Sequence, residues 1–252
     1  MIKNYLKIAI RNITKHKGSS LINILGLAIG MSASLLILYF VSYEKSYDSF
    51  HENSNNNYRF SYERTDQEGE SVRFASCCPP MGLRIREQYP DVEKVARIFR
   101  RKSSVSYFDK MFIEENLYYA ESEFFEIFKY KFISGDPITG LKEPNKAFIS
   151  NSTAKKYFGD KNPIGQILSV DKKVDYQITG VFEDIPSNSH LKFDIMLSYP
   201  SLLNIYGKDI EISWGDSGWF TYLLLKQNAD PKELDKKLPA LVDEDFKEAL
   251  KY

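Results

Sequence analysis

The 252-residue sequence has little cysteine, few histidines and no surplus of either charge. Two cysteines are too few for a disulfide framework or a four-thiolate zinc site. Lys and Arg total 34 and Asp and Glu total 34, so the basic surplus of a nucleic-acid-binding protein is absent. Hydrophobic residues make up 43% of the chain, which excludes disorder, and a charged fraction of 27% argues against a polytopic membrane protein.

Acidic residues are absent from the first 43 positions, and the first acid is Glu44. Five cations lie in the first 17 positions: Lys3, Lys7, Arg11, Lys15 and Lys17. The remaining residues, 44–252, carry 29 cations against 34 anions, a net charge of −5. A basic start on a mildly acidic body indicates two regions that work in different surroundings.

An uncharged segment follows these cations, from Gly18 to Tyr43. Its apolar part, residues 21–43, would rise about 35 Å as a helix, enough to cross a hydrocarbon core of about 30 Å. The far end carries aromatic residues that suit an interfacial belt: Tyr39, Phe40 and Tyr43. We predict a transmembrane helix over 18–43. The basic flank predicts a cytoplasmic N-terminus, with the residues after Tyr43 outside.

Two other interpretations of this segment compete with a membrane span. A cleaved signal peptide has an apolar region of about 7–15 residues and a small-residue cleavage site, whereas this segment is longer and ends in aromatics. A buried helix of a soluble protein is disfavoured, because 26 consecutive residues carry no charge.

The segment before the span, residues 1–17, has the pattern of an amphipathic helix. Apolar residues recur at helical spacing, while Lys3, Lys7, Arg11 and Lys15 step along another face every four residues. We predict a basic helix that lies on the cytoplasmic membrane surface and contacts lipid. The alternative is a flank that only sets the topology.

Small residues form a stripe inside the span, at Gly26, Gly30 and Ser34. This spacing lets another helix approach closely, so we predict that the stripe packs against a partner helix. A single small-residue stripe is a weak signal, because glycine is common in membrane helices.

After the span, short strands alternate with short helices. Residues 57–64 are predicted to form a strand with Tyr58, Phe60 and Tyr62 on one face. A helix is predicted from Pro79 to about Tyr89, and a second strand at 92–100, which together make a β-α-β unit over 57–100.

The middle of the chain, 101–218, is predicted to be an inserted α+β subdomain. The segments expected there are strands near 103–108 and 111–119, a helical turn at 121–128, a helix at 152–159 and a strand at 174–182. In the turn, Phe124, Phe125 and Phe128 are expected to be buried.

The last part, 219–252, repeats the first pattern with a strand at 220–226 and a helix from Pro231. Its inward side is expected at Leu234, Leu238, Leu241, Val242, Asp245 and Ala249. No strand follows, so the sheet would lack its last strand, and we expect the chain to continue in a longer parent protein.

Motifs of enzyme chemistry are absent: the sequence contains no GxxxxGK[ST] loop, no HExxH and no GxSxG. Of the three histidines, His16 is predicted on the other side of the membrane, so only His51 and His190 can meet. A metal site is a weak alternative to hydrogen-bonded turn residues. Glu114 and Glu115 are expected on a solvated face. We therefore expect no enzyme and no cofactor.

The adjacent cysteines Cys77 and Cys78 leave two alternatives open. Outside the cytoplasm they can form a strained vicinal disulfide. Otherwise they are two small residues before the Pro-Pro start of a helix.

Several stretches resemble MacB/FtsX-like permeases of ABC transporters, and they occur in the order of that family. They are the N-terminal NYLKIAIRNITKHKGSSLINILGLAIG, YDSFHENSNNNYRF at 47–60, STAKKYFGDKNPIGQIL at 152–168, ITGVFEDIPSNSHLKFDIMLS at 178–198 and WGDSGWFTYLLLKQNADPKELDKKLPALV at 214–242. Each motif is moderately specific, and their ordered combination over nearly the whole chain is strong. The chain is similar in style to large permeases common in Bacteroidota.

The resemblance implies an α+β fold: an N-terminal transmembrane helix and a periplasmic core domain with a split β-α-β Porter-like part and an inserted Sabre-like subdomain. The Porter-like part would comprise 44–100 and 219–252, and the Sabre-like insertion 101–218. The implied partners are a cytoplasmic ABC ATPase, three more permease helices, a second permease copy, membrane lipid and a periplasmic adaptor, with no nucleic acid.

The resemblance further implies an inner-membrane permease subunit, without its own ATPase motif, that couples ATP hydrolysis by a partner to movement of its periplasmic domain for export or signalling. The alternative is a single-span sensor or ligand-binding domain. An anchored extracytoplasmic hydrolase is disfavoured by the missing motifs.

Overall fold

The computed structural model describes residues 2–52, 54–65 and 69–249, with the side chains of Ile2, Arg64 and 242–249 outside the description. The chain divides into two compact units, Met1–Ser49 and Phe50–Tyr252. Its mixed α+β composition, with one N-terminal apolar helix and a sheet-rich body, confirms the predicted fold class.

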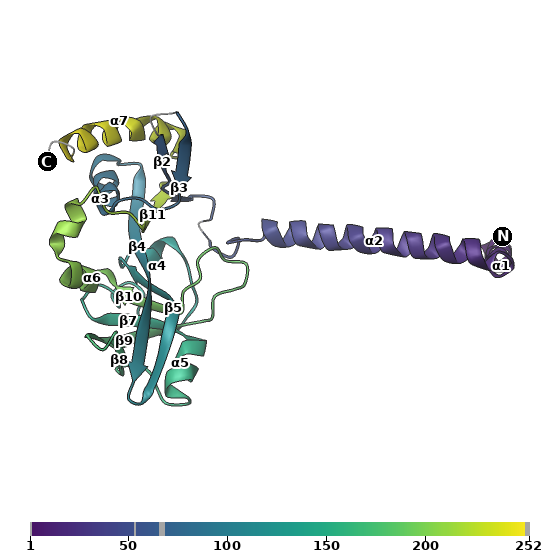
Figure 1. Cartoon of the computed structure of the whole chain (residues 1–252), viewed down its shortest axis with the longest axis horizontal. Helices are drawn as coiled ribbons and strands as arrows, with labels where there is room; N and C mark the ends of the chain where they lie inside the picture. The colour runs from purple at the N-terminus through teal and green to yellow at the C-terminus, as the bar shows by residue number, and fades with distance from the viewer. Residues whose placement is uncertain (1, 53, 66–68, 250–252) are drawn as a thin grey trace. The chain divides into compact units, whose positions relative to one another are not determined.

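The first unit contains two helices, α1 (Ile2–Lys15) and α2 (Lys17–Lys45), separated at His16. His16 leaves helical geometry, with φ −117° and ψ 59°, and α1 is seen nearly end-on in Figure 1 while α2 lies along the picture. Among the described residues, α2 is the one helix long and apolar enough to cross a membrane, and its apolar window has no buried residue. The apolar side chains of α2 therefore need surroundings other than this chain, as a membrane span does.

The second unit is built on one nine-stranded sheet within the described residues. Its order is β1-β11-β4-β5-β10-β7-β9-β6, and β8 pairs with β4 and β9. The strands are β1 (Asn57–Arg59), β4 (Val92–Tyr107), β5 (Lys110–Ala120), β6 (Phe132–Ser134), β7 (Lys146–Ser150), β8 (Ile167–Val170), β9 (Val174–Phe182), β10 (Ile195–Ser198) and β11 (Trp219–Leu225). A separate hairpin pairs β2 (Tyr62–Thr65) with β3 (Ser71–Phe74).

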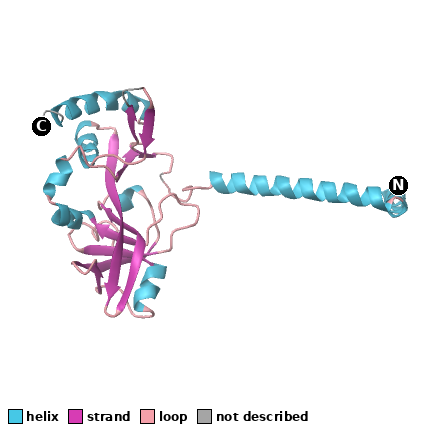
Figure 2. Ribbon diagram, in the orientation of Figure 1, coloured by secondary structure: helices cyan, strands magenta, loops and turns pink. Residues whose placement is uncertain are grey.

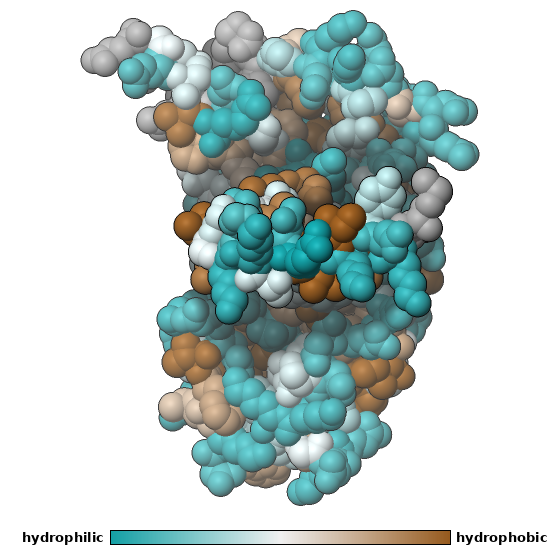
Figure 3. Space-filling model, turned by 90° about the vertical axis from the view of Figure 1, so that its right-hand side faces the viewer, coloured by the Kyte–Doolittle hydropathy of each residue, from teal (hydrophilic) through white to brown (hydrophobic). Residues whose placement is uncertain are grey.

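The helices of this unit lie outside the strands, which run through its middle (Figure 2). They are α3 (Pro79–Gln88), α4 (Phe124–Ile127), α5 (Asn151–Phe158), α6 (Tyr199–Tyr206), the short 3₁₀ helix η1 (Lys208–Ile212) and α7 (Pro231–Ala249). In Figure 3 the foreground is the first unit seen from its N-terminal end, where hydrophilic and hydrophobic side chains lie together.

Strand β11 lies between β1 and β4 and is antiparallel to both. Strands β1 and β4 are therefore parallel to each other, and α3 is the crossover that connects them. A strand from the end of the chain thus completes a β-α-β unit from its beginning, which is the split arrangement that the sequence predicts.

Two strand boundaries differ from the prediction. The strand expected at 57–64 is broken after Arg59, because β1 pairs with β11 whereas β2 turns away to pair with β3. The strands expected at 92–100 and 103–108 are one strand, β4, with a bulge between Arg101 and Ser103. The predicted subdomain boundary at residue 100 falls inside β4.

Buried side chains form three clusters. One lies beneath α3 and α7 and includes Met81, Ile85, Leu223, Leu225 and Leu234. The second is mostly aromatic and includes Phe124, Phe125, Phe128, Phe148 and Phe182. The third includes Tyr119, Ile149, Tyr157, Tyr176 and Ile195. The three phenylalanines expected to be buried around α4 are therefore confirmed.

The inward side of α7 follows the prediction at Leu234 and Leu241, which are buried, and at Leu238, which packs against them. The side chains of Val242, Asp245 and Ala249 lie outside the described residues.

Candidate functional site

The predicted helix-packing residues lie in the middle of α2. An added Cβ at Gly26 or Gly30 would meet no atom within 4 Å, and the Ser34 hydroxyl donates to the carbonyl of Gly30 over 2.9 Å. The stripe is exposed on this chain, and its packing against another helix stays a prediction.

The predicted membrane-surface cations lie on α1 and on the first residue of α2. Lys3, Lys7, Arg11, Lys15 and Lys17 are all exposed. Exposed apolar residues share α1 with them, including Leu6, Ile10 and Ile13. An exposed helix with both kinds of side chain suits a lipid surface.

The residues that open the second unit are anchored by an aromatic cluster. His51 is only 3% exposed, and its ring centroid lies 4.1 Å from Phe50, 5.0 Å from Phe128 and 4.9 Å from Tyr130. Rings at these separations are in direct contact. The chain is therefore fixed to the body two residues after the end of the first unit.

The anchor continues to the central sheet. The Phe128 ring packs edge-on against Tyr222 of β11, with centroids 4.9 Å apart, and the Tyr222 hydroxyl lies 2.9 Å from Nε2 of His190. His51 and His190 thus both lie against Phe128. Within the described residues, no group of three His, Cys, Asp or Glu residues has the arrangement of a metal site.

Sequence reasoning missed this anchor, although it singled out the stretch 47–60 that contains it. The available signal was the Phe50-His51 pair directly after a span, together with the unusual aromatic run at 124–130. What the sequence alone lacks is the pairing of these two segments across more than 70 positions.

A buried ion network joins segments from both ends of the body. The guanidinium of Arg97, on β4, donates to Glu121 Oε1 over 2.7 Å and to Glu211 Oε1 over 2.8 Å, and it stacks on Tyr199 at 4.6 Å. It also donates to the Pro79 carbonyl at the start of α3. Arg97 is 1% exposed, so its charge depends on these partners.

The electrostatics of Arg97 reflect a balance of two effects. Burial alone would lower the pKa of Arg97, but the charge and hydrogen bonds of Glu121 outweigh it, so the pKa is raised. Gly82 of α3 makes room for this side chain, because an added Cβ would lie 2.7 Å from Arg97 Cγ and Cδ. The network holds α3, β4 and η1 in one arrangement.

Glu114 departs from its expected solvated position. It is 6% exposed, and its carboxylate accepts from the Tyr157 hydroxyl over 2.5 Å and from Lys156 Nζ over 2.8 Å. Burial, and then hydrogen bonding to Glu114, raises the pKa of Tyr157. The prediction was wrong because α5 brings these partners from 42 and 43 positions away. Glu115 is exposed and pairs with Lys102.

The adjacent cysteines are free thiols in different surroundings. Cys77 is buried with its Sγ 3.3 Å from Thr221 Oγ1, and burial raises its pKa to about 12. Cys78 is half-buried, and burial raises its pKa too. The alternative of two small residues before the helix start is therefore the one observed.

Comparison with known proteins gives a match that covers most of α2 and most of the second unit. A family model described as MacB-like periplasmic core domain matches residues 20–241. A domain assigned to a permease from Porphyromonas gingivalis is similar in structure, with 25% identity, a TM-score of 0.67, and coverage of 77% of this chain and 83% of that chain.

The periplasmic region of MacB from Actinobacillus actinomycetemcomitans shares the fold, with 14% identity and a TM-score of 0.56. That likeness covers 75% of this chain and 83% of that chain. A search of curated proteins gives no match.

Proposed function

The chain belongs to the family of MacB-like periplasmic core domains, and from this premise we propose that it is the N-terminal part of an ABC transporter permease subunit that transmits motion. The observation that carries the proposal is the extent of the family match, which begins inside α2 and ends in α7. One continuous match therefore includes both the apolar helix and the sheet unit, as a permease requires and a soluble binding domain does not.

The proposed mechanism is mechanical. An ATPase partner in the cytoplasm hydrolyses ATP, the permease helices shift, and the periplasmic domain moves with them to drive export or signal across the membrane. MacB-like permease domains work with ATPase partners in ABC transporters. The chain itself supplies no ATPase motif, so its part is to carry displacement rather than to break bonds.

Specific residues of the chain would make the proposed contacts with lipid and with a neighbouring helix. The cations of α1 seat the N-terminus on the cytoplasmic face of the inner membrane, and Gly26, Gly30 and Ser34 receive a neighbouring permease helix. The remaining permease helices, a second permease copy and a periplasmic adaptor complete the assembly. The family match favours this assembly over a membrane-anchored sensor.

The anchor around His51 is the proposed point of transmission. Displacement of the chain at Phe50 reaches β11 by two routes: along the chain into β1, which pairs with β11, and through the ring contacts of His51 with Phe128 and of Phe128 with Tyr222. Because packed rings resist compression, a shift at the start of the body moves the central strand as well.

Hydrogen exchange tests the proposal on the whole permease with its ATPase partner in lipid nanodiscs. We expect ATP binding to change the exchange of residues 44–60, of residues 124–130 and of β11 together. His51→Ala should weaken the response of residues 124–130 relative to that of β1 and β11, because it removes the ring contacts and leaves the pairing of β1 with β11 intact. The matched control is Phe108→Ala, since Phe108 is 86% exposed and outside the anchor. Unchanged exchange in the wild-type body on ATP binding would contradict the proposal.

A further inference from the structure

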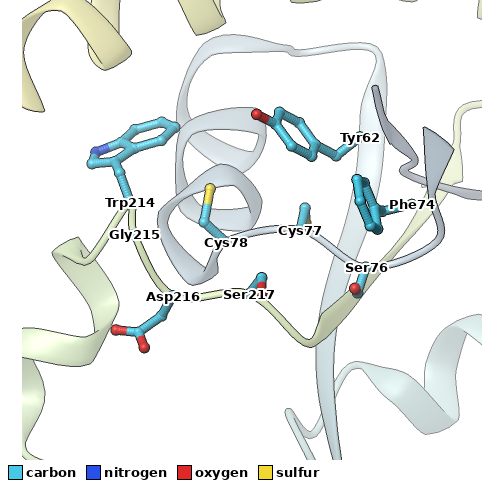
Figure 4. Close-up of a pocket in the computed structure, with 9 residues that line it drawn as sticks. All are labelled: Tyr62, Phe74, Ser76, Cys77, Cys78, Trp214, Gly215, Asp216 and Ser217. Atoms are coloured by element: carbon cyan, nitrogen blue, oxygen red, sulfur yellow. The ribbon is translucent and has the colours of Figure 1, made fainter. Parts of the chain in front are cut away.

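A cavity of about 330 Å³ lies where the β2–β3 hairpin, the start of α3 and the segment after η1 meet. Figure 4 shows the residues that line it: Tyr62, Phe74, Ser76, Cys77, Cys78, Trp214, Gly215, Asp216 and Ser217. The proposed mechanical function uses none of them. Its volume is near the lower end of the range for small-molecule pockets, about 300–1,000 Å³.

Three aromatic side chains from three segments line the cavity. Tyr62 and Phe74 face each other across the hairpin, with ring centroids 6.3 Å apart and planes inclined by 26°. Trp214 stands on the other side, and the Tyr62 hydroxyl points toward it in Figure 4. The Cys78 sulfur points toward the space between these two rings.

The charge at the cavity has one sign. Among the described lining residues Asp216 is the only charged one, and its carboxylate accepts from the Ser213 hydroxyl over 2.5 Å. Figure 4 shows this carboxylate pointing away from the rings, so it supplies negative potential from the rim rather than a direct ligand. Aromatic faces are also negative, and they attract cations.

The lining chemistry distinguishes between kinds of cation. A metal ion needs several lone pairs, yet the Cys77 sulfur already lies 3.3 Å from Thr221 Oγ1 and the ring faces offer no lone pair. An alkylated ammonium ion needs no hydrogen bond, is weakly hydrated, and buries its methyl groups against ring faces. For an anion, the described lining offers no cationic side chain to pair with.

We propose that this cavity binds a small alkylated ammonium ion, free or as a lipid headgroup, against the aromatic wall formed by the stacked Tyr62–Phe74 pair and by Trp214. This binding site goes beyond the proposed mechanical function. It does not depend on that function, because every lining residue belongs to the second unit.

Two built-in reporters make the proposal testable on the whole chain in detergent, with choline as the probe. Cys78 lines the cavity while the only other cysteine is buried, so choline should slow alkylation of Cys78. Trp214 is one of two tryptophans, and the other, Trp219, is 4% exposed. Choline should therefore also change the tryptophan fluorescence that comes from Trp214.

A neutral isostere separates charge from shape. In that compound a tert-butyl group replaces the trimethylammonium group of choline. We expect millimolar choline to protect Cys78, and the neutral isostere or sodium chloride at equal concentration to leave the rate unchanged. Equal protection by choline and the isostere would overturn the proposal in favour of an apolar pocket, and protection by neither would overturn it outright.

Variants locate the binding to the rings. Trp214→Leu and Tyr62→Leu should each weaken choline protection by about two- to fivefold, the loss expected for one ring face. Phe108→Leu is the control, since Phe108 lies on the exposed β4–β5 turn. Unchanged protection in both ring variants, with circular dichroism like that of the wild type, would contradict the site.

A further arm distinguishes the source of the ion. Nanodiscs with phosphatidylcholine protect Cys78 without added choline if the headgroup is the ligand, and nanodiscs of phosphatidylglycerol do not. If the ligand is a free ion, both nanodiscs leave Cys78 reactive until choline is added.

Discussion

At the scale of single residues, Arg97 has the largest expected effect on stability. Its 1% exposed side chain pairs with the buried Glu121 and with Glu211, which is 26% exposed. Arg97→Met leaves Glu211 without its partner and Glu121 with Arg86 alone, and we expect the free energy of unfolding to fall by about 3 kcal/mol. Urea denaturation of the chain in detergent measures it.

Lys102 provides the matched control on the same strand. Its ion pair with Glu115 is more than half exposed on both sides, so Lys102→Met should change the free energy of unfolding by less than about 1 kcal/mol. Equal losses for the two variants would show that Arg97 acts by its size alone and that the buried charges contribute nothing.

The two thiols should respond differently to reagents and to pH. Iodoacetamide is expected to label Cys78 in the folded chain and Cys77 only after unfolding, because Cys77 is buried and its pKa is raised to about 12. Mass spectrometry of the alkylated peptides measures both sites. A disulfide between them, or faster labelling of Cys77, would contradict this.

The raised pKa of Cys77 also links stability to pH. A thiol with a raised pKa in the folded state contributes stability that is complete below its ordinary pKa, 9.0, and is lost as pH approaches 12. Cys77→Ala removes this contribution, so the variant should lose less free energy of unfolding between these two pH values than the wild type does.

How much of the site the sequence predicts depends on the range of the interactions. The cations of α1 and the small residues of α2 are visible in the sequence because their spacing is local. The partners of Arg97 lie 24 and 114 positions away, and no local pattern signals them. Glu114 shows the same limit. Its burial depends on Lys156 and Tyr157 of α5, and nothing in the sequence around Glu114 indicates that α5 packs there.

At the scale of elements, the basic face of α1 should bind anionic lipid. A cation near an anionic membrane surface contributes about 1 kcal/mol. Replacing Lys3, Lys7 and Arg11 by Gln should therefore raise hydrogen exchange of α1 in nanodiscs that contain phosphatidylglycerol. Replacing both lysines by Arg keeps the charge and should leave exchange unchanged. If α1 of the wild type exchanges equally in neutral and anionic nanodiscs, the charge of the lipid does not protect α1.

The small-residue stripe of α2 makes a separate prediction. In the whole permease, Gly26→Leu and Gly30→Leu fill the space that a neighbouring helix needs, so assembly of the permease and its transport activity should both fall. Ala28→Leu is the control, since residue 28 faces the opposite side of the helix. Copurification of the subunits measures assembly, and unchanged assembly and transport would show that the stripe packs against nothing.

The elements that the sequence predicts best carry their own end signals. Helix α3 begins at a Pro pair, and α5 begins after Ser150, whose hydroxyl caps Thr153, and ends at Gly159. Short strands such as β6 and β10 were missed, because three or four residues acquire their identity from the strands beside them. The break expected inside β4 was wrong because a bulge accommodates its polar residues.

At the scale of the whole molecule, the zero net charge is the sum of a basic N-terminal region and an acidic body. The five cations before the span and the net −5 of residues 44–252 make a strong asymmetry across α2. Positive flanks stay in the cytoplasm, so the sheet unit should lie outside. Alkaline phosphatase is active only outside the cytoplasm. When it is fused after Lys226, we expect phosphatase activity, which would show that the sheet unit lies outside.

A fusion after Thr14 lacks α2 and is the inactive control, so activity after Lys226 reports the side on which the sheet unit lies. Replacing all five cations by Gln removes the charge bias, so activity after Lys226 should fall as part of the population inserts in the opposite direction. If the five-cation variant keeps full activity, the large folded unit rather than the basic flank sets the topology. If the fusion after Lys226 is inactive in the wild-type sequence, the sheet unit faces the ATPase side, and motion cannot pass through His51 to a periplasmic domain.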